Sequence, residues 1–144
     1  MPAPIHTVCS KCQAINRIQS ARLGDKPTCG KCGGLVLSSS PLVFTGSNFD
    51  RFISKTELPI LVDFWAPWCG HCRTMAPAFE QAALALYPHI LTAKVNTEEF
   101  KSLSARFSVS SLPTLVLFKG GREVKRVSGG MSAQQITSWA KQFA

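Results

Sequence analysis

Residues 58–77 read LPILVDFWAPWCGHCRTMAP, a nearly continuous apolar run followed by two cysteines that are separated by two residues. An apolar run without polar alternation indicates a strand buried on both faces, as at the centre of an α/β sheet. Cys69 and Cys72 follow the end of this strand, and a helix is expected from Cys69 to about Leu86. The stretch therefore predicts a buried strand that delivers two sulfur atoms to the start of a long helix.

The rest of the chain after residue 41 alternates between strand and helix signals. Ser47 with Asp50 and Ser132 with Gln135 are typical of helix starts, and the glycines at 120–121 indicate a tight hairpin. The predicted order is strand 42–45, helix 47–54, strand 58–66, helix 69–86, strand 90–95, helix 98–107, strands 114–118 and 123–127, and a helix from 132. This order predicts an α/β fold with a mixed central sheet flanked by helices.

The start of the long helix determines the chemistry of Cys69. Unpaired backbone N–H groups and the positive end of the helix dipole favour a thiolate there, and a thiolate is the species that attacks disulfides. Cys72 lies three residues on, on the same helical face, where its sulfur can reach Cys69 and resolve a mixed disulfide. A zinc half-site or a structural disulfide is the alternative, and a metal would need two further ligands nearby.

Asp63 places a carboxylate inside the apolar strand. Desolvation is expected to raise its pKa unless Lys94 offsets the effect. A raised pKa suits a proton acceptor for Cys72. The alternative is a structural aspartate that is held by hydrogen bonds at the end of the strand.

Residues 1–37 contain four of the six cysteines and no aromatic residue, so this segment cannot fold by apolar burial alone. Two CxxC pairs separated by sixteen residues have the spacing of a zinc ribbon, and the expected ligands are Cys9, Cys12, Cys29 and Cys32. Four thiolates complete a tetrahedral site, so we expect one structural zinc ion without His6 as a ligand. Two further redox disulfides are the alternative, which reducing conditions disfavour. Residues 38–41 are the predicted linker to a domain over 42–144.

Composition excludes several classes of function. The chain has 144 residues, a net charge of +8 and 45% hydrophobic residues, as expected for a folded protein. Its sixteen Lys and Arg residues are dispersed without interleaved aromatic residues, so no nucleic-acid binding is expected. No apolar run is long enough for a membrane span, and the N-terminus lacks the features of a signal peptide. A cytoplasmic monomer is the expectation.

The segment WAPWCGHC, with Pro77 and the SLPT at 111–114, resembles the thioredoxin family over roughly residues 42–144. The four-cysteine segment before it resembles the bacterial thioredoxin 2 subfamily. The resemblance implies a thioredoxin fold, reduction by thioredoxin reductase, and disulfide-containing proteins as substrates. It also implies that Pro113 is a cis-proline beside the catalytic sulfurs and that Trp68 borders the site, whereas Trp65 is expected mainly to pack. The implied substrate-docking residues are Gly70, Leu112, Thr114 and Gly129.

His71 departs from the usual thioredoxin pattern, which has proline there, and gives the CGHC motif found in protein disulfide isomerases. An imidazole and a free backbone N–H near Cys69 stabilise its thiolate, which makes the disulfide a stronger oxidant. The first expectation is a protein disulfide reductase. A more oxidising isomerase or oxidase is the second, and a non-enzymatic zinc-dependent binding module is the third.

Overall fold

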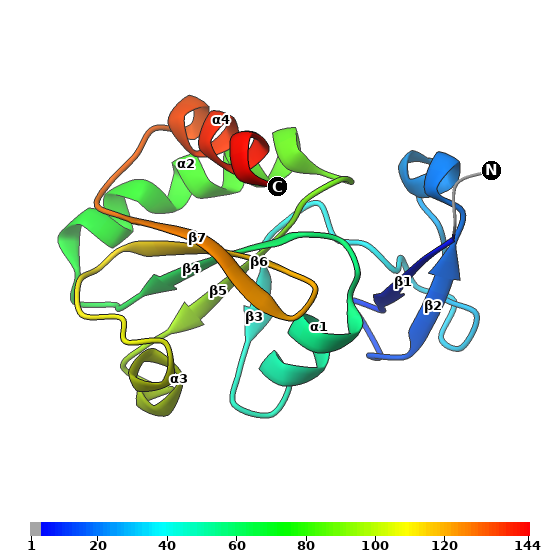
Figure 1. Cartoon of the computed structure of the whole chain (residues 1–144), viewed down its shortest axis with the longest axis horizontal. Helices are drawn as coiled ribbons and strands as arrows, with labels where there is room; N and C mark the ends of the chain where they lie inside the picture. Colours follow the sequence, from blue (N-terminus) through cyan, green and yellow to red (C-terminus); the bar gives the residue numbers. More distant parts are fainter. Residues whose placement is uncertain (1–3) are drawn as a thin grey trace.

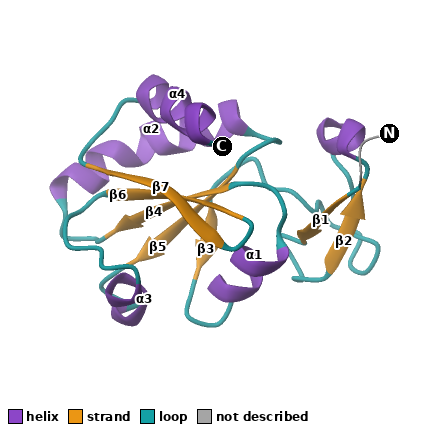
Figure 2. Cartoon of the chain, in the orientation of Figure 1, coloured by secondary structure: helices purple, strands orange, loops and turns teal. Residues whose placement is uncertain are grey.

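The computed structural model describes residues 4–144, in which a five-stranded sheet lies between two layers of helices (Figure 1). A separate two-stranded sheet lies beside one end of the larger sheet (Figure 2). Among the described residues, no helix combines the length and the hydropathy that crossing a bilayer requires.

The larger sheet has the strand order β3-β5-β4-β6-β7. Its first three strands run parallel, whereas β6 and β7 are antiparallel additions, so the predicted mixed sheet is confirmed. The elements in chain order are β1 (Ile5–Val8), β2 (Ile15–Ile18), a 3₁₀ helix (Ser20–Asp25), β3 (Leu42–Phe44), α1 (Phe49–Lys55), β4 (Ile60–Trp65), α2 (Gly70–Leu86), β5 (Leu91–Asn96), α3 (Lys101–Arg106), β6 (Thr114–Lys119), β7 (Arg122–Ser128) and α4 (Ala133–Phe143).

Strand β4 is buried on both faces, as its unbroken apolar sequence predicts. Leu61 packs into a cluster with α2 and α4, whereas Val62 and Phe64 pack into a second cluster with α1 and α3. Figure 1 shows these two helix pairs on opposite faces of the sheet. The burial fixes the end of β4, from which the chain turns directly into α2.

Two helix starts differ from the sequence predictions. The Ser47 hydroxyl contacts Thr45 Oγ1 instead of capping a helix, and α1 begins only at Phe49. Helix α3 is shorter than predicted, because Asn96 Oδ1 accepts the backbone N–H groups of residues 98 and 99 in a turn before the helix. A local side-chain acceptor thus delays the start of α3 to Lys101.

The capping box predicted at the last helix is confirmed. Ser132 Oγ accepts the Gln135 backbone N–H at 3.1 Å, and Gln135 Oε1 accepts the Ser132 N–H at 2.9 Å. These bonds satisfy N–H groups that the first turn of α4 leaves without a partner.

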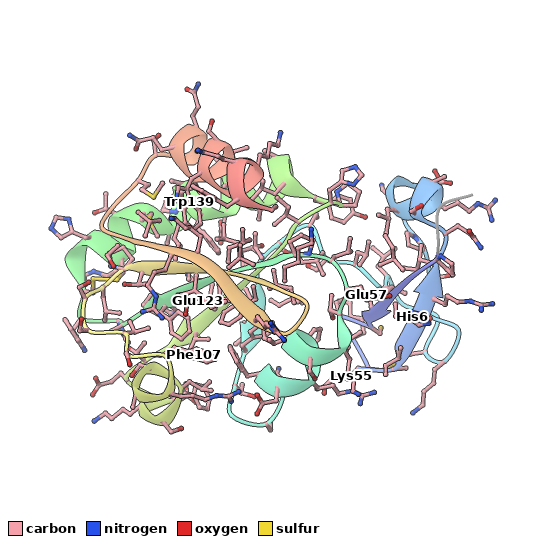
Figure 3. The ribbon with its side chains drawn as sticks, viewed as in Figure 1. His6, Lys55, Glu57, Phe107, Glu123 and Trp139 are labelled. Atoms are coloured by element: carbon pink, nitrogen blue, oxygen red, sulfur yellow. A yellow bond between two sulfur atoms is a disulfide. The ribbon has the colours of Figure 1, made fainter. Side chains whose placement is uncertain are left out.

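The two-stranded unit packs against α1 and shares its core. Val8, Ile18 and Val36 belong to the same buried cluster as Phe49 and Phe52 of α1. Polar contacts join the same surfaces: His6 Nδ1 lies 2.9 Å from Glu57 Oε1, and the Glu57 N–H donates to the His6 carbonyl at 2.8 Å (Figure 3). The smaller unit therefore adjoins the residues that precede β4, at the end of the molecule opposite the start of α2 (Figure 1).

Candidate redox site and metal centre

The two cysteines after β4 lie where the sequence predicts them. Cys69 is the N-cap of α2, with extended backbone angles, and a disulfide joins it to Cys72 across a Cα–Cα distance of 5.3 Å. The Cys72 backbone N–H points at Cys69 Sγ at 3.2 Å. Both residues are nearly buried, with 7% of Cys69 and 3% of Cys72 exposed. The geometry gives Cys69 a donor that can stabilise negative charge on sulfur.

The predicted cis-proline and two of the predicted docking residues lie beside the disulfide or beside one another. Leu112 packs against the two cysteines, and the Leu112–Pro113 peptide bond is cis. The Gly129 N–H donates to the Pro113 carbonyl at 2.9 Å, so the start of β6 is tied to the end of β7. Gly129 has φ 102°, a conformation that favours glycine.

Thr114 and Gly70 have different surroundings. Thr114 is buried, and its hydroxyl donates to the Ser111 carbonyl at 2.6 Å, which closes the loop before β6. Gly70 is exposed, and a Cβ added there would meet nothing within 4 Å. Thr114 therefore shapes the loop, whereas Gly70 leaves open space at the start of α2.

Trp68 lies on the surface beside Cys69, with 67% of its area exposed. Its indole N–H donates to Glu98 Oε2 at 3.2 Å, a partner that sequence reasoning missed because Glu98 is thirty positions away. Trp68 and Cys69 line a cleft of about 270 Å³ together with Thr97, Ser104, Val109, Ser110 and Leu112. The cleft has no charged lining residue and opens next to the first sulfur.

His71 lines a different cleft from the one beside Cys69. This cleft has a volume of about 250 Å³ and lies between the first turns of α2 and α4; its other lining residues are Thr74, Met75, Gly130, Met131, Ser132 and Gln135. Met131 and Gln135 were missed from the sequence, which carries no periodic signal joining them to α2. The redox pair therefore lies between two clefts of different composition.

Asp63 is only 1% exposed, and neither of its carboxylate oxygens has a hydrogen-bond partner among the described residues. Burial raises the pKa of Asp63 to about 7, although the positive charge of Lys94 acts in the opposite direction. Lys94 lies opposite Asp63 in the β4–β5 register, and its Nζ is 4.7 Å from the centre of the Trp65 ring.

The four N-terminal cysteines form one cluster. Their sulfur atoms all lie within 4.8 Å of one another, at 3.8 Å for Cys9 and Cys32 and 3.6 Å for Cys12 and Cys29. A tetrahedral zinc ion with Zn–S bonds of about 2.3 Å separates its sulfur ligands by about 3.8 Å. All four are free cysteines, and none is joined in a disulfide. The cluster therefore fits zinc in both ligand type and spacing.

Backbone and side-chain donors surround Cys29 in particular. The N–H of Cys32, the Asn16 amide and the N–H of Lys31 all point at its sulfur and lower the pKa of the Cys29 thiol to about 6. Asn16 lies on β2, outside both CxxC pairs, and its Nδ2 is 3.4 Å from Cys29 Sγ. Sequence reasoning missed it, because the motif spacing describes ligands and not the groups behind them.

Comparison with known proteins agrees with this geometry. The thioredoxin family profile matches residues 40–142, and the profile for the N-terminal zinc ribbon of thioredoxin 2 matches residues 8–34. Thioredoxin C-3 of Corynebacterium nephridii is 42% identical over 135 residues, which cover 94% of this chain and 92% of the relative. The thioredoxin of Alicyclobacillus acidocaldarius subsp. acidocaldarius is 43% identical over 95 residues, covering 66% of this chain and 90% of that protein.

A solved structure has the same fold. A single-site mutant of the thioredoxin from Halobacterium salinarum superposes with a TM-score of 0.68 at 29% identity, over 76% of this chain and 96% of its own. The profiles, the relatives and the fold agree with one another over the larger unit. The chain therefore belongs to the thioredoxin family, as a protein disulfide oxidoreductase with an N-terminal zinc-ribbon domain.

Proposed function

We propose that this thioredoxin reduces disulfides of cytoplasmic proteins through Cys69 and Cys72 and receives its electrons from thioredoxin reductase. The observation that carries the proposal is the Cys72 N–H aimed at Cys69 Sγ at the start of α2, within reach of the second sulfur. A thiolate held by such a donor is the nucleophile that disulfide exchange requires. Four zinc-binding thiols also fit a reducing compartment such as the cytoplasm.

The cycle has two exchange steps. The Cys69 thiolate attacks one sulfur of the substrate disulfide, which forms a mixed disulfide and releases the first substrate thiolate. Cys72 gives its proton to Asp63 and attacks Cys69 Sγ, which closes the intramolecular disulfide and releases the second substrate thiolate. Two electrons pass to the substrate, and two electrons from thioredoxin reductase restore the dithiol.

Asp63 suits the role of proton acceptor because of its surroundings. With a pKa of about 7, this carboxyl is close to half ionised at neutral pH and can take up and release a proton. Its oxygens have no competing partner among the described residues. We assign Asp63 this role for the second step alone.

The substrate is proposed to dock over the surface around the disulfide. Trp68, Gly70, Leu112 and Gly129 would form this surface, and the buried Pro113 and Thr114 would hold the loop behind it. Trp68 offers an exposed aromatic face, and Leu112 offers an apolar contact next to the sulfurs. Aromatic and aliphatic groups of this kind anchor protein partners.

The N-terminal domain is proposed to be a stabilising unit. Cys9, Cys12, Cys29 and Cys32 would hold one zinc ion, which supplies a structural cross-link and no reaction, since four thiolates leave no open position. We propose domain limits of 1–37 and 42–144 with a linker at 38–41; the two profiles match residues 8–34 and 40–142. Both centres are built from one chain, which fits a monomer.

Substitution of single cysteines tests the proposal. Cys69→Ser is expected to abolish insulin reduction in the presence of NADPH and thioredoxin reductase, because the attacking sulfur is lost. Cys72→Ser is expected to accumulate a mixed disulfide that mass spectrometry detects. Leu84→Ala, at an exposed position on the same helix, serves as the control. Insulin reduction by Cys69→Ser at the parent rate would show that another group is the nucleophile.

A second candidate function is a more oxidising isomerase or oxidase. His71 favours it, since this residue brings a backbone N–H and an imidazole to the position between the cysteines. An oxidising protein would be reduced readily by thioredoxin reductase yet reduce insulin poorly, so the same assay separates the two functions.

A further inference from the structure

A cavity of about 390 Å³ lies where the zinc ribbon meets the thioredoxin domain. Its lining comes from the first CxxC loop, the turn after the 3₁₀ helix, the segment leading to β3, and the end of α2. The lining residues are Ser10, Lys11, Lys26, Leu35, Leu37, Ser38, Ser39, Ser40 and Tyr87. None of them belongs to the redox site, and the volume is that of a small-molecule site.

The charge of the cavity is positive. Lys11 and Lys26 both line it, and no acidic residue does. Within residues 4–144, neither lysine lies within ion-pair distance of a carboxylate, since the ion pairs there involve other basic residues. Two positive charges in one concave site favour an anionic ligand.

Hydroxyl groups add hydrogen-bonding capacity. Five lining residues carry one: Ser10, Ser38, Ser39, Ser40 and Tyr87. Ser10 Oγ already donates to the Leu35 carbonyl, and Ser38 Oγ donates to the Ser40 carbonyl. The hydroxyls of Ser39 and Tyr87 are not engaged by any described residue, so they remain available to a ligand.

An apolar part completes the cavity. Leu37 is buried, Leu35 is exposed, and the Tyr87 ring packs against the shared core. Lys26 is the C-cap of the 3₁₀ helix and has φ 53°, a conformation common where helices end. A ligand here would contact the ribbon and the thioredoxin domain at once.

We propose that this cavity binds a small organic phosphate, a phosphate monoester with an apolar group. A phosphate carries nearly two negative charges and three acceptor oxygens, which match two ammonium groups and several hydroxyls. A carboxylate carries one charge and would leave one lysine without a counter-charge. The leucines and the Tyr87 ring contact the apolar group.

Phenyl phosphate is the probe for the test. Tyr87 is the only tyrosine of the chain, so fluorotyrosine labelling places a single ¹⁹F signal at the cavity. We expect a saturable shift of this signal and a stoichiometry of one per chain by calorimetry. Benzoate lacks the second negative charge, and inorganic phosphate lacks the apolar group. Both are expected to bind at least fivefold more weakly than phenyl phosphate.

Matched variants locate the site. Lys11→Gln and Lys26→Asn are each expected to weaken binding at least fivefold. Lys31→Gln is the control, since Lys31 has the same place in the second CxxC loop and lies outside the cavity lining. Zinc content, measured for every variant, verifies the ribbon. The proposal is overturned if phenyl phosphate gives no saturable shift, if Lys31→Gln weakens binding equally, or if benzoate or inorganic phosphate binds as tightly.

Discussion

Asp63 brings an ionisable group into the centre of the sheet at a cost in stability. Its pKa is about 7 in the folded protein, against about 4 for an aspartate in an unfolded chain. Between these values the folded state holds a proton that the unfolded state has lost. The free energy of unfolding therefore falls as the pH rises from about 4 to 7, and stays lower above that.

Asp63→Asn is expected to remove this pH dependence. The variant should exceed the parent in stability by roughly 4 kcal/mol at pH 8, at about 1.4 kcal/mol per pKa unit, and match it at pH 3. Urea unfolding at the two pH values measures the difference. The same variant should slow the second exchange step and leave attack by Cys69 intact. Parallel stability curves for variant and parent would contradict an aspartate with a raised pKa.

His71→Pro is expected to make the redox pair more reducing. The change removes an imidazole and a backbone N–H from the position between the two cysteines, and we expect both groups to favour the thiolate of the reduced form. A fall of about 30 mV corresponds to roughly 1.4 kcal/mol, which one lost contact can supply. Equilibration with glutathione measures the potential. His89→Gln, in the loop after α2, is the control, and an unchanged potential in His71→Pro would refute the role of His71.

At the scale of residues, motif spacing predicts the cysteines and not their neighbours. The redox pair, Cys69 and Cys72, is close in sequence. The four ribbon cysteines follow a repeated CxxC pattern. Glu98 beside Trp68 and Asn16 beside Cys29 depend on tertiary packing between distant segments. A single sequence contains no local signal for such pairs.

At the scale of elements, the first residues of α3 and α4 are determined by side-chain oxygens that accept backbone N–H groups within one turn. Ser132→Ala is expected to lower the free energy of unfolding by about 1 kcal/mol, because α4 loses the hydroxyl oxygen that accepts the Gln135 backbone N–H. Ser47→Ala is the matched control and should change stability little, since Ser47 caps no helix. Urea unfolding compares the two variants, and equal losses would contradict this account of the helix starts.

The order of elements in the larger unit could be predicted, whereas two of their boundaries could not. Hydrophobic periodicity gives the strands and helices because it reflects which faces are buried. The start of α3 depends on whether Asn96 bonds to the turn or to solvent, which the sequence leaves undecided. The docking of β1 on α1 had no sequence signal either, because the contact joins two segments with separate patterns.

At the scale of the whole molecule, the ribbon and the thioredoxin domain share one buried cluster. Chelation of the proposed zinc ion is therefore expected to destabilise the larger domain as well. All three tryptophans, Trp65, Trp68 and Trp139, lie outside residues 1–37, so their fluorescence reports the larger domain alone. We expect its melting temperature to fall by several degrees, at about 4 °C per kcal/mol. Restored zinc is the control, and an unchanged temperature would mean that the domains fold independently.

The ribbon lies at the end of the molecule opposite the start of α2, so it adds mass without narrowing the approach to the disulfide (Figure 1). We expect large folded substrates and short peptides to reach the disulfide from the same face. A protein fastened to a solid support through its ribbon would keep that face turned outward. The ribbon therefore offers a point of attachment and does not cover the disulfide.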